Sequence, residues 1–348
     1  MMENFILPGA SGGELKDLLT QIGEKPFRAK QICDWLYSKC EFDPEKMLNL
    51  PQSLRSKLKE NCRSPRSRVI ECAPGSGGTE KLLIELEDAQ AIEMVLIPSP
   101  ERMTFCLSTQ VGCPVRCRFC ASGAHGLVRN LRYDEILEEF YHGVRKHGAL
   151  PDNIVFMGIG EGLLNWKNLQ RALTVLTEPL PEGFAMSPRR ITVSTSGYLP
   201  GMEEFARWGR PFNLAVSLHA VDDLTRSKLI PDNCRYPVQD ILRSCQRCSE
   251  ATGRMVTFEY TLIDKINDDP AMGRELGRIA RDLHAKVNLI ACNPVNDEFK
   301  RPSEKRLKEF QNAVSQHATT VTMRIEKGSS AASACGQLRL RRQLKERD

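Results

Sequence analysis

The chain has 348 residues, of which 41% are hydrophobic and 27% are charged, and its formal net charge is +5. This composition excludes disordered and fibrous classes, and the length allows one large domain and a smaller one. No apolar run reaches membrane-spanning length, and the first residues lack the pattern of a signal peptide. We therefore expect a cytoplasmic protein with no membrane partner, whose thirteen cysteines are reduced thiols and metal ligands.

Residues 1–67 are predicted to form a small helical module. Apolar residues recur there at helical spacing in three segments, at 15–19, at 32–36 after Pro26, and at 48–58. The pattern then changes to short strands at 82–86 and 93–97, after a glycine-rich turn at 74–78. Residues 68–100 are therefore predicted to form a β-rich linker.

Strand and helix patterns alternate in residues 101–335, before a basic tail at 336–348. Strands are predicted at 104–109, 154–157, 191–194, 214–218, 256–262, 287–290 and 321–325, with helices such as 238–251, 270–284 and 304–317 between them. Such alternation implies parallel strands joined by right-handed crossovers. About six units are too few to close an eight-fold barrel. We therefore predict an α/β fold, a partial (β/α)6 barrel whose active face lies at the carboxyl ends of its strands.

Three cysteines, Cys113, Cys117 and Cys120, lie within eight residues after the first predicted barrel strand. Three thiolates from one loop suit three irons of a 4Fe-4S cube and leave the fourth iron open for substrate. Structural zinc prefers four protein ligands. A zinc site would therefore have to recruit Cys106, and this alternative stays open.

Unusual short sequences follow other barrel strands and are expected at the same face. Glycines at 158, 160 and 162 surround Glu161, which could receive an ammonium group. Because position 163 is Leu, this run is not a dinucleotide-binding fingerprint. Further polar residues end later strands, at 194–197, 217–219 and 293. Each alone is ordinary turn chemistry, but together they indicate a ligand site.

The cysteine motif resembles that of radical S-adenosylmethionine (radical SAM) enzymes, and longer segments resemble one family among them, the radical-SAM adenine methyltransferases of ribosomal RNA. The segments that carry this resemblance are 23–29, 106–113, 193–197, 217–220, 256–260, 286–290 and 334–338. The resemblance implies a radical-SAM barrel, one 4Fe-4S cluster held by Cys113, Cys117 and Cys120, and S-adenosylmethionine as methyl donor and radical source. It also implies cofactor contacts by Gly160, Glu161, Ser194, Ser217, Leu218, His219 and Asn293.

The resemblance further implies covalent catalysis by the protein itself. Adenine C2 is a poor nucleophile, so a cysteine, Cys335, first takes the methyl group, and the methylated side chain is then activated by a radical. Cys106 releases the product by forming a transient disulfide bond with Cys335, and Glu93 accepts a proton. The implied substrate is 23S ribosomal RNA, with transfer RNA as a possible second one. The implied partner is an electron donor such as flavodoxin with its reductase, and a monomer is expected.

Several alternatives remain at this point. The chain has Gly162 where the family usually has proline, and residues 327–333 lack the family's usual acidic residues, so adenine C8 as the target, or a divergent paralogue with another RNA, stays open. A non-catalytic iron-sulfur or zinc RNA-binding protein is the competing class.

The basic residues between Arg55 and Arg68 are expected to contact RNA backbone. The alternative interpretation is a solvated helix face. Cys245 and Cys248 are expected to pack rather than bind metal.

Overall fold

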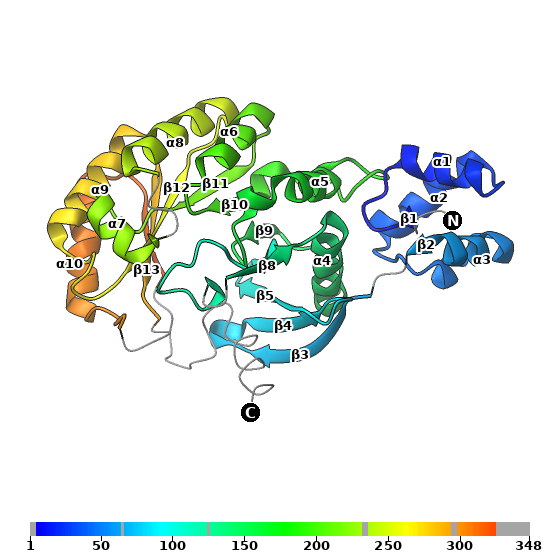
Figure 1. Cartoon of the computed structure of the whole chain (residues 1–348), viewed down its shortest axis with the longest axis horizontal. Helices are drawn as coiled ribbons and strands as arrows, with labels where there is room; N and C mark the ends of the chain where they lie inside the picture. The colour runs from blue at the N-terminus through cyan, green and yellow to red at the C-terminus, as the bar shows by residue number, and fades with distance from the viewer. Residues whose placement is uncertain (1–4, 64–65, 124–125, 232–235, 294–297, 325–348) are drawn as a thin grey trace.

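The computed structural model describes residues 5–63, 66–123, 126–231, 236–293 and 298–324. The amino-terminal part is helical, as predicted, with α1 (Gly12–Gln21), α2 (Ala29–Cys33) and α3 (Gln52–Asn61). Ser11 and Glu14 form a capping box that starts α1. Two short strands, β1 (Phe5–Ile6) and β2 (Cys62–Arg63), pair in parallel and bring the ends of this part together. It lies at one end of the molecule (Figure 1), and we call it the helical module.

A ten-stranded sheet organises the rest of the described chain, in the order β14-β13-β12-β11-β10-β9-β6-β5-β4-β3. Seven of its strands run parallel, and each pairs with its neighbour in this order. They are β6 (Arg102–Cys106), β9 (Asn153–Phe156), β10 (Ile191–Thr195), β11 (Asn213–Ser217), β12 (Thr257–Leu262), β13 (Lys286–Ala291) and β14 (Val321–Arg324). The sheet is open, because its order has two ends. These findings confirm the predicted α/β partial barrel.

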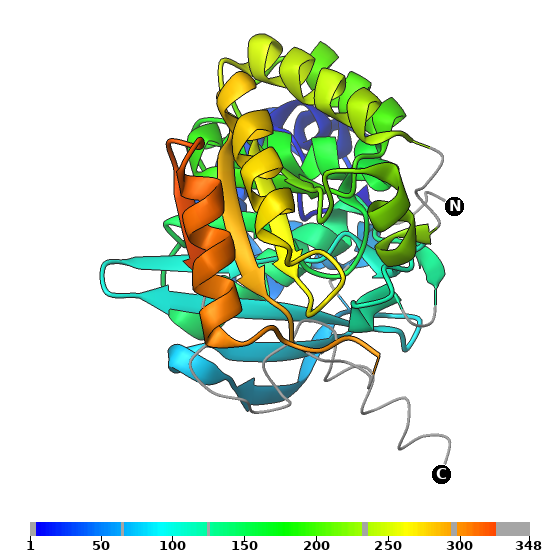
Figure 2. The same ribbon diagram turned by 90° about the vertical axis from the view of Figure 1, so that its left-hand side faces the viewer.

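Helices cover the outer side of the curved parallel strands (Figures 1 and 2). They are α4 (Tyr133–His147), α5 (Trp166–Thr177), α6 (Leu199–Trp208), α7 (Asp223–Leu229), α8 (Val238–Thr252), α9 (Pro270–Asp282) and α10 (Glu304–Ser315). Cys245 and Cys248 on α8 are buried in the apolar core, as their packing interpretation required. Among the described residues, no helix is long and apolar enough to cross a membrane.

The segment predicted as a linker extends the main sheet. Its strands β3 (Arg68–Pro74), β4 (Glu80–Glu85) and β5 (Ala91–Ser99) pair antiparallel with one another, and β5 pairs antiparallel with β6. Met94 and Phe105 face α4, since a Cβ on Gly143 would lie 2.1 and 2.7 Å from them. Because side chains alternate along strands, Glu93 and Cys106 face the opposite side, which is the inside of the barrel.

The helical module packs against the barrel through α4 and the segment after α5. The Tyr141 hydroxyl on α4 donates to the carbonyl oxygen of Leu36 at 3.0 Å. Phe184 packs edge-on against Tyr37 of the module and against Tyr141. The module is therefore held by buried polar and aromatic contacts, not by the chain connection alone.

Candidate active site

The predicted polar residues gather at one edge of the sheet, where the parallel strands end. The loop at 158–162 follows β9, Ser194 is the penultimate residue of β10, Ser217 ends β11, and Asn293 lies two residues beyond β13. The carboxyl ends of parallel strands meet on one face. We call these segments, 158–162, 194–197, 217–219 and Asn293, the rim.

Glu161 is tied to the next strand of the rim. One carboxylate oxygen accepts from the backbone N–H and the hydroxyl of Ser196 at 2.6 and 2.8 Å, and the other accepts from the N–H of Leu163 at 3.2 Å. Burial raises the pKa of Glu161, and these hydrogen bonds oppose the rise. The carboxylate is thus already well supplied with donors. An ammonium group at this position would have to share it with Ser196.

Gly160 brings its backbone close to the segment that precedes the cysteine loop. Its φ is +115°, a conformation that favours glycine. A Cβ there would lie 2.7 Å from the Cβ of Gln110 and 2.8 Å from the hydroxyl of Thr109. The side-chain oxygen of Gln110 accepts from the N–H of Glu161 at 2.8 Å. Glycine at 160 therefore permits the contact that positions Glu161.

Arg226 on α7 holds the rim together, although no pattern in the sequence marks it. Its guanidinium donates to the carbonyl oxygens of Ser196 and Leu218, at 2.5 and 3.2 Å. Only 2% of Arg226 is exposed, although arginine is rarely fully buried. A forked donor that reaches carbonyls after two adjacent strands fixes their relative position.

His219 connects the rim to the cysteine loop. Its ring packs edge-on against Phe119, with 4.9 Å between centroids. Burial, and then the charge of Arg226, lower the pKa of His219 to about 3, so the ring is neutral near pH 7. Nδ1 accepts from the N–H of Thr261 at 3.0 Å, which assigns the ring proton to Nε2. Leu218 beside it is fully buried.

The cysteine loop packs on apolar residues from several strand ends. Cys113, Cys117 and Phe119 lie against a buried cluster that contains Ile230 after α7, Ile263 after β12 and Cys292 after β13. The loop therefore lies at the rim, as predicted from its place in the sequence.

The three thiols are close enough to affect one another. Burial first, and the charge of a Cys120 thiolate to a lesser extent, raise the pKa of Cys113 to about 12. Burial raises the pKa of Cys117 well above its usual value, and Cys120 and Cys113 add to the rise. Bound cations convert such thiols to thiolates. Across the described ranges, no three His, Cys, Asp or Glu side chains converge on one position for a single metal ion. In an iron-sulfur cube each thiolate bonds its own iron, and three thiols from one buried loop that act on one another's pKa are a donor set that fits such a cube.

Glu93 and Cys106 share the inner face of the sheet. Cys106 lies opposite Val95 in the β5–β6 register, and Glu93 is two residues from Val95 on the same face. Both side chains are buried, 3% and 4% exposed. Lys81, 2% exposed, lies opposite Val95 on β4, and no pattern in the sequence marks this buried lysine. Cys335 lies outside the described residues.

The basic segment near α3, predicted to contact RNA backbone, has acceptors of the protein itself beside its cations. All six cations are engaged: Arg55 donates to the carbonyl oxygen of Glu45, Lys57 pairs with Glu24, Lys59 with Glu45, Arg63 and Arg66 with Glu87, and Arg68 with Glu85. Their carboxylate partners are distant in sequence, so the charge run alone could not show them. This segment is therefore less cationic than its sequence indicated.

A partial barrel with three cysteines in a loop at its strand ends defines the radical SAM class of enzyme. Comparisons with known proteins agree. The chain matches the family model of the radical SAM superfamily over residues 107–273 and that of the ribosomal RNA large subunit methyltransferase N-terminal domain over residues 7–63.

Curated relatives extend this match to nearly the whole chain. A probable dual-specificity RNA methyltransferase RlmN of Akkermansia muciniphila is 40% identical over 95% of this chain and 94% of its own length. One from Lachnoclostridium phytofermentans is 40% identical over 94% and 92%. A crystal structure of a radical SAM methyltransferase from Sphaerobacter thermophilus superposes with a TM-score of 0.89 at 39% identity, over 96% of this chain and 98% of that one. The chain belongs to the RlmN family of radical SAM RNA methyltransferases.

Proposed function

We propose that this protein methylates C2 of an adenine in 23S ribosomal RNA and in transfer RNA, with S-adenosylmethionine as methyl donor. The relatives are named as dual-specificity RNA methyltransferases. The observation that carries the proposal is the cysteine loop packed against the rim through Phe119 and His219, in a chain that matches both family models.

Cys113, Cys117 and Cys120 are the proposed ligands of a 4Fe-4S cluster. The rim residues Gly160, Glu161, Ser194, Ser217, Leu218, His219 and Asn293 are the proposed contacts of S-adenosylmethionine. When bound, the cluster and this cofactor supply a one-electron cleavage that starts the radical chemistry. The electron donor is proposed to be flavodoxin with its reductase.

The protein's own thiols and carboxylate carry the methyl transfer. The Cys335 thiolate displaces the methyl group from the sulfonium of S-adenosylmethionine, so that S-methylcysteine forms and S-adenosylhomocysteine leaves. The radical chemistry would remove one hydrogen atom from the S-methyl group, join its carbon to adenine C2 and take up one electron from the adduct, after which Glu93 would accept the proton of C2. The Cys106 thiolate would then attack the sulfur of Cys335 to form a disulfide bond, while the bond from that sulfur to the transferred carbon breaks and its electron pair, with a proton, completes the methyl group of the released product. Burial of Glu93 and Cys106 on one inner face supports their shared task.

Residues 1–67 are proposed as an RNA-binding module, 68–100 as an extension of the sheet, 101–335 as the catalytic barrel and 336–348 as a basic tail. An adenine in a helix must leave its stack before a buried site can reach it, so the module's task is to hold the surrounding RNA. The working form is proposed to be a cytoplasmic monomer.

The sulfur chemistry is tested by two variants of the full chain. Tryptic peptides of active wild-type enzyme should carry S-methylcysteine at position 335, and Cys335→Ala should yield no methylated RNA. Cys106→Ala should accumulate RNA covalently attached to Cys335, visible as a slow-migrating band that nuclease removes. Full RNA methylation by Cys335→Ala would contradict the proposal. A competing non-catalytic RNA-binding role predicts no dependence on Cys335 at all.

A further inference from the structure

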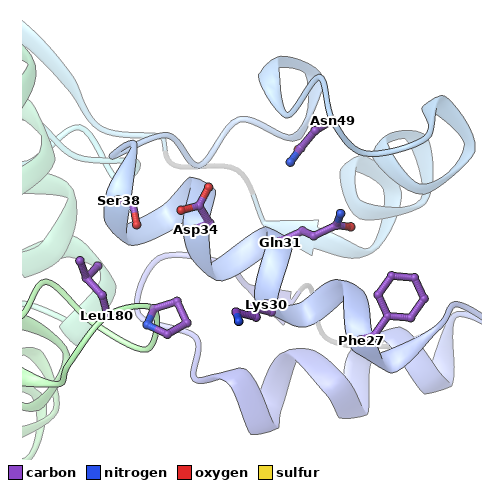
Figure 3. A pocket seen from close by; sticks show the side chains of 8 residues that line it. Phe27, Lys30, Gln31, Asp34, Ser38, Asn49 and Leu180 are labelled. Carbon is purple, nitrogen blue, oxygen red and sulfur yellow. The ribbon is translucent and has the colours of Figure 1, made fainter.

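A groove of about 620 Å³ lies on the helical module, away from the rim (Figure 3). Its floor is one helical face formed by Phe27, Lys30, Gln31, Asp34 and Ser38, while Asn49 lies on one side and Leu180, from the segment after α5, on another. The volume is in the usual range of ligand sites. Because Leu180 belongs to the barrel part of the chain, the groove spans the contact between the two parts.

Phe27 offers an exposed aromatic surface at the groove. Its side chain is 61% exposed, whereas Tyr37, also of the module, is 2% exposed. The Arg28 guanidinium carbon lies 5.2 Å from the centre of the Phe27 ring, a cation–π arrangement. Exposed aromatic rings beside arginine are the platforms on which proteins stack unpaired RNA bases.

The cations beside Phe27 differ from those of the basic segment near α3. Each cation from Arg55 to Arg68 is engaged by a carboxylate or a carbonyl oxygen, as described above. Within the described ranges, by contrast, neither Lys25 nor Arg28 nor Lys30 forms an ion pair with a carboxylate, and Lys25 and Lys30 are exposed. Their charge is therefore available to a polyanion.

The groove also carries both kinds of hydrogen-bonding group. Asn49 accepts from the Trp35 indole with its carbonyl oxygen, which leaves its NH2 group as a donor. Gln31 likewise accepts from Arg28 through its oxygen, at 3.2 Å. The Asp34 carboxylate is an acceptor, paired at 3.4 Å with Lys39. Donors and an acceptor beside a stacking surface match the edge of a nucleobase, whereas a purely apolar groove would not.

We propose that this groove binds an unpaired nucleotide of the RNA substrate, with its base on Phe27, its edge against Gln31, Asp34 and Asn49, and flanking phosphates on Lys25 and Lys30. The proposal rests on the proposed function only in taking RNA as the substrate. The groove would bind an RNA nucleotide with little sequence preference, at a site remote from the reacting adenine. The groove thereby holds single-stranded RNA while the rim acts on another nucleotide.

Fluorescence anisotropy with the full-length protein tests this site without any methylation. The probes are a short labelled single-stranded oligoadenylate and a duplex RNA of the same length. Phe27→Ala should weaken single-strand binding by about 5- to 100-fold, Phe27→Trp should restore it, and duplex binding should change little. Lys30→Gln should lower the slope of log affinity against log salt by about 0.7 on the single strand.

Leu48→Ala is the matched control, because Leu48 is 74% exposed on the same module but does not line the groove. It should bind both probes as wild type does. Circular dichroism melting shows whether any variant is misfolded, and exposed Phe27 should tolerate replacement. Equal single-strand affinity for wild type and Phe27→Ala would overturn the groove proposal. Since the assay contains no S-adenosylmethionine, that result would leave the proposed methyl transfer standing, and failed methylation would not affect the groove.

Discussion

Glu161, in the loop after β9, accepts two hydrogen bonds from Ser196, the residue that follows the neighbouring strand β10. This pair links two segments of the rim through one buried carboxylate. Glu161→Gln replaces an acceptor oxygen with an NH2 group that faces two donors, so we expect the rim to shift. Equilibrium dialysis should show at least about tenfold weaker S-adenosylmethionine binding by the reconstituted protein, roughly the 1.4 kcal/mol of one hydrogen bond.

Glu204→Gln is the control for this change. Glu204 is exposed on α6 and pairs only with nearby Arg207 among the described residues, so its replacement should leave cofactor affinity unchanged. Wild-type affinity in Glu161→Gln would show that the Ser196 contact does not position the cofactor.

Arg226 provides a second test of the rim. Arg226→Met leaves buried carbonyl oxygens of Ser196 and Leu218 without their donor, so we expect a loss of about 3 kcal/mol in the free energy of unfolding. Arg226→Lys keeps the charge but loses the forked guanidinium, so it should recover only part of the lost free energy of unfolding. Urea titration measures both. Lys228→Met, at an exposed position of the same helix, should change stability little; an equal loss there would refute a special role for Arg226.

The cluster assignment predicts selective loss of iron. After anaerobic reconstitution, Cys117→Ala should lose the brown absorption and most of its bound iron, because one cube corner lacks its thiolate. Cys72→Ala removes an exposed thiol of β3 and should bind iron as wild type does. Stoichiometric zinc without iron in the wild-type protein would instead favour the zinc alternative.

The environment of His142 makes the stability of the protein sensitive to acid. The Ser67 hydroxyl lies 3.0 Å from His142 Nε2 and also bonds Glu138. Burial, and then Arg145, lower the pKa of His142 from 6.5 to about 4. Between these values the unfolded chain takes up a proton that the native ring does not, so stability falls as the pH falls through this window. Over the whole window this proton uptake lowers the free energy of unfolding by about 3 kcal/mol.

Replacing His142 isolates this contribution. His142→Gln should flatten the fall in the urea midpoint between pH 6.5 and pH 4 relative to wild type. Glu138, whose pKa burial raises, is present in both proteins, so its opposite pH dependence is common to the two curves. Parallel curves would contradict the shifted pKa of His142.

Much of the fold followed from local pattern. The strand predicted at 191–194 became β10, because alternating Ile191 and Val193 bury one face. The cysteine loop could be predicted because the spacing of its three cysteines places three thiolates in one loop. The rim could be predicted because parallel strands end on one face. The segment at 68–100 was predicted as strands, but its pairing with β6 depends on sheet order, which local pattern does not encode.

Contacts between distant residues were beyond the sequence. Arg226 reaches Ser196 across 30 positions, and Lys57 pairs with Glu24 across 33. Neither partner is marked by spacing or composition. The sequence therefore indicates a more cationic segment than the structure shows. Phe27 is a single aromatic residue beside three cations, and local pattern does not mark it because its exposure is a property of the fold.

Nucleoside analysis of the RNA product tests the central claim most directly. Wild-type protein and Cys335→Ala are each reconstituted with iron and sulfide, then incubated with unmethylated 23S ribosomal RNA, S-adenosylmethionine and a flavodoxin reducing system. The RNA is then digested to nucleosides for mass spectrometry with authentic standards. We predict 2-methyladenosine from the wild-type protein and none from Cys335→Ala. Formation of 8-methyladenosine alone, or unmethylated RNA despite cofactor cleavage, would contradict this account.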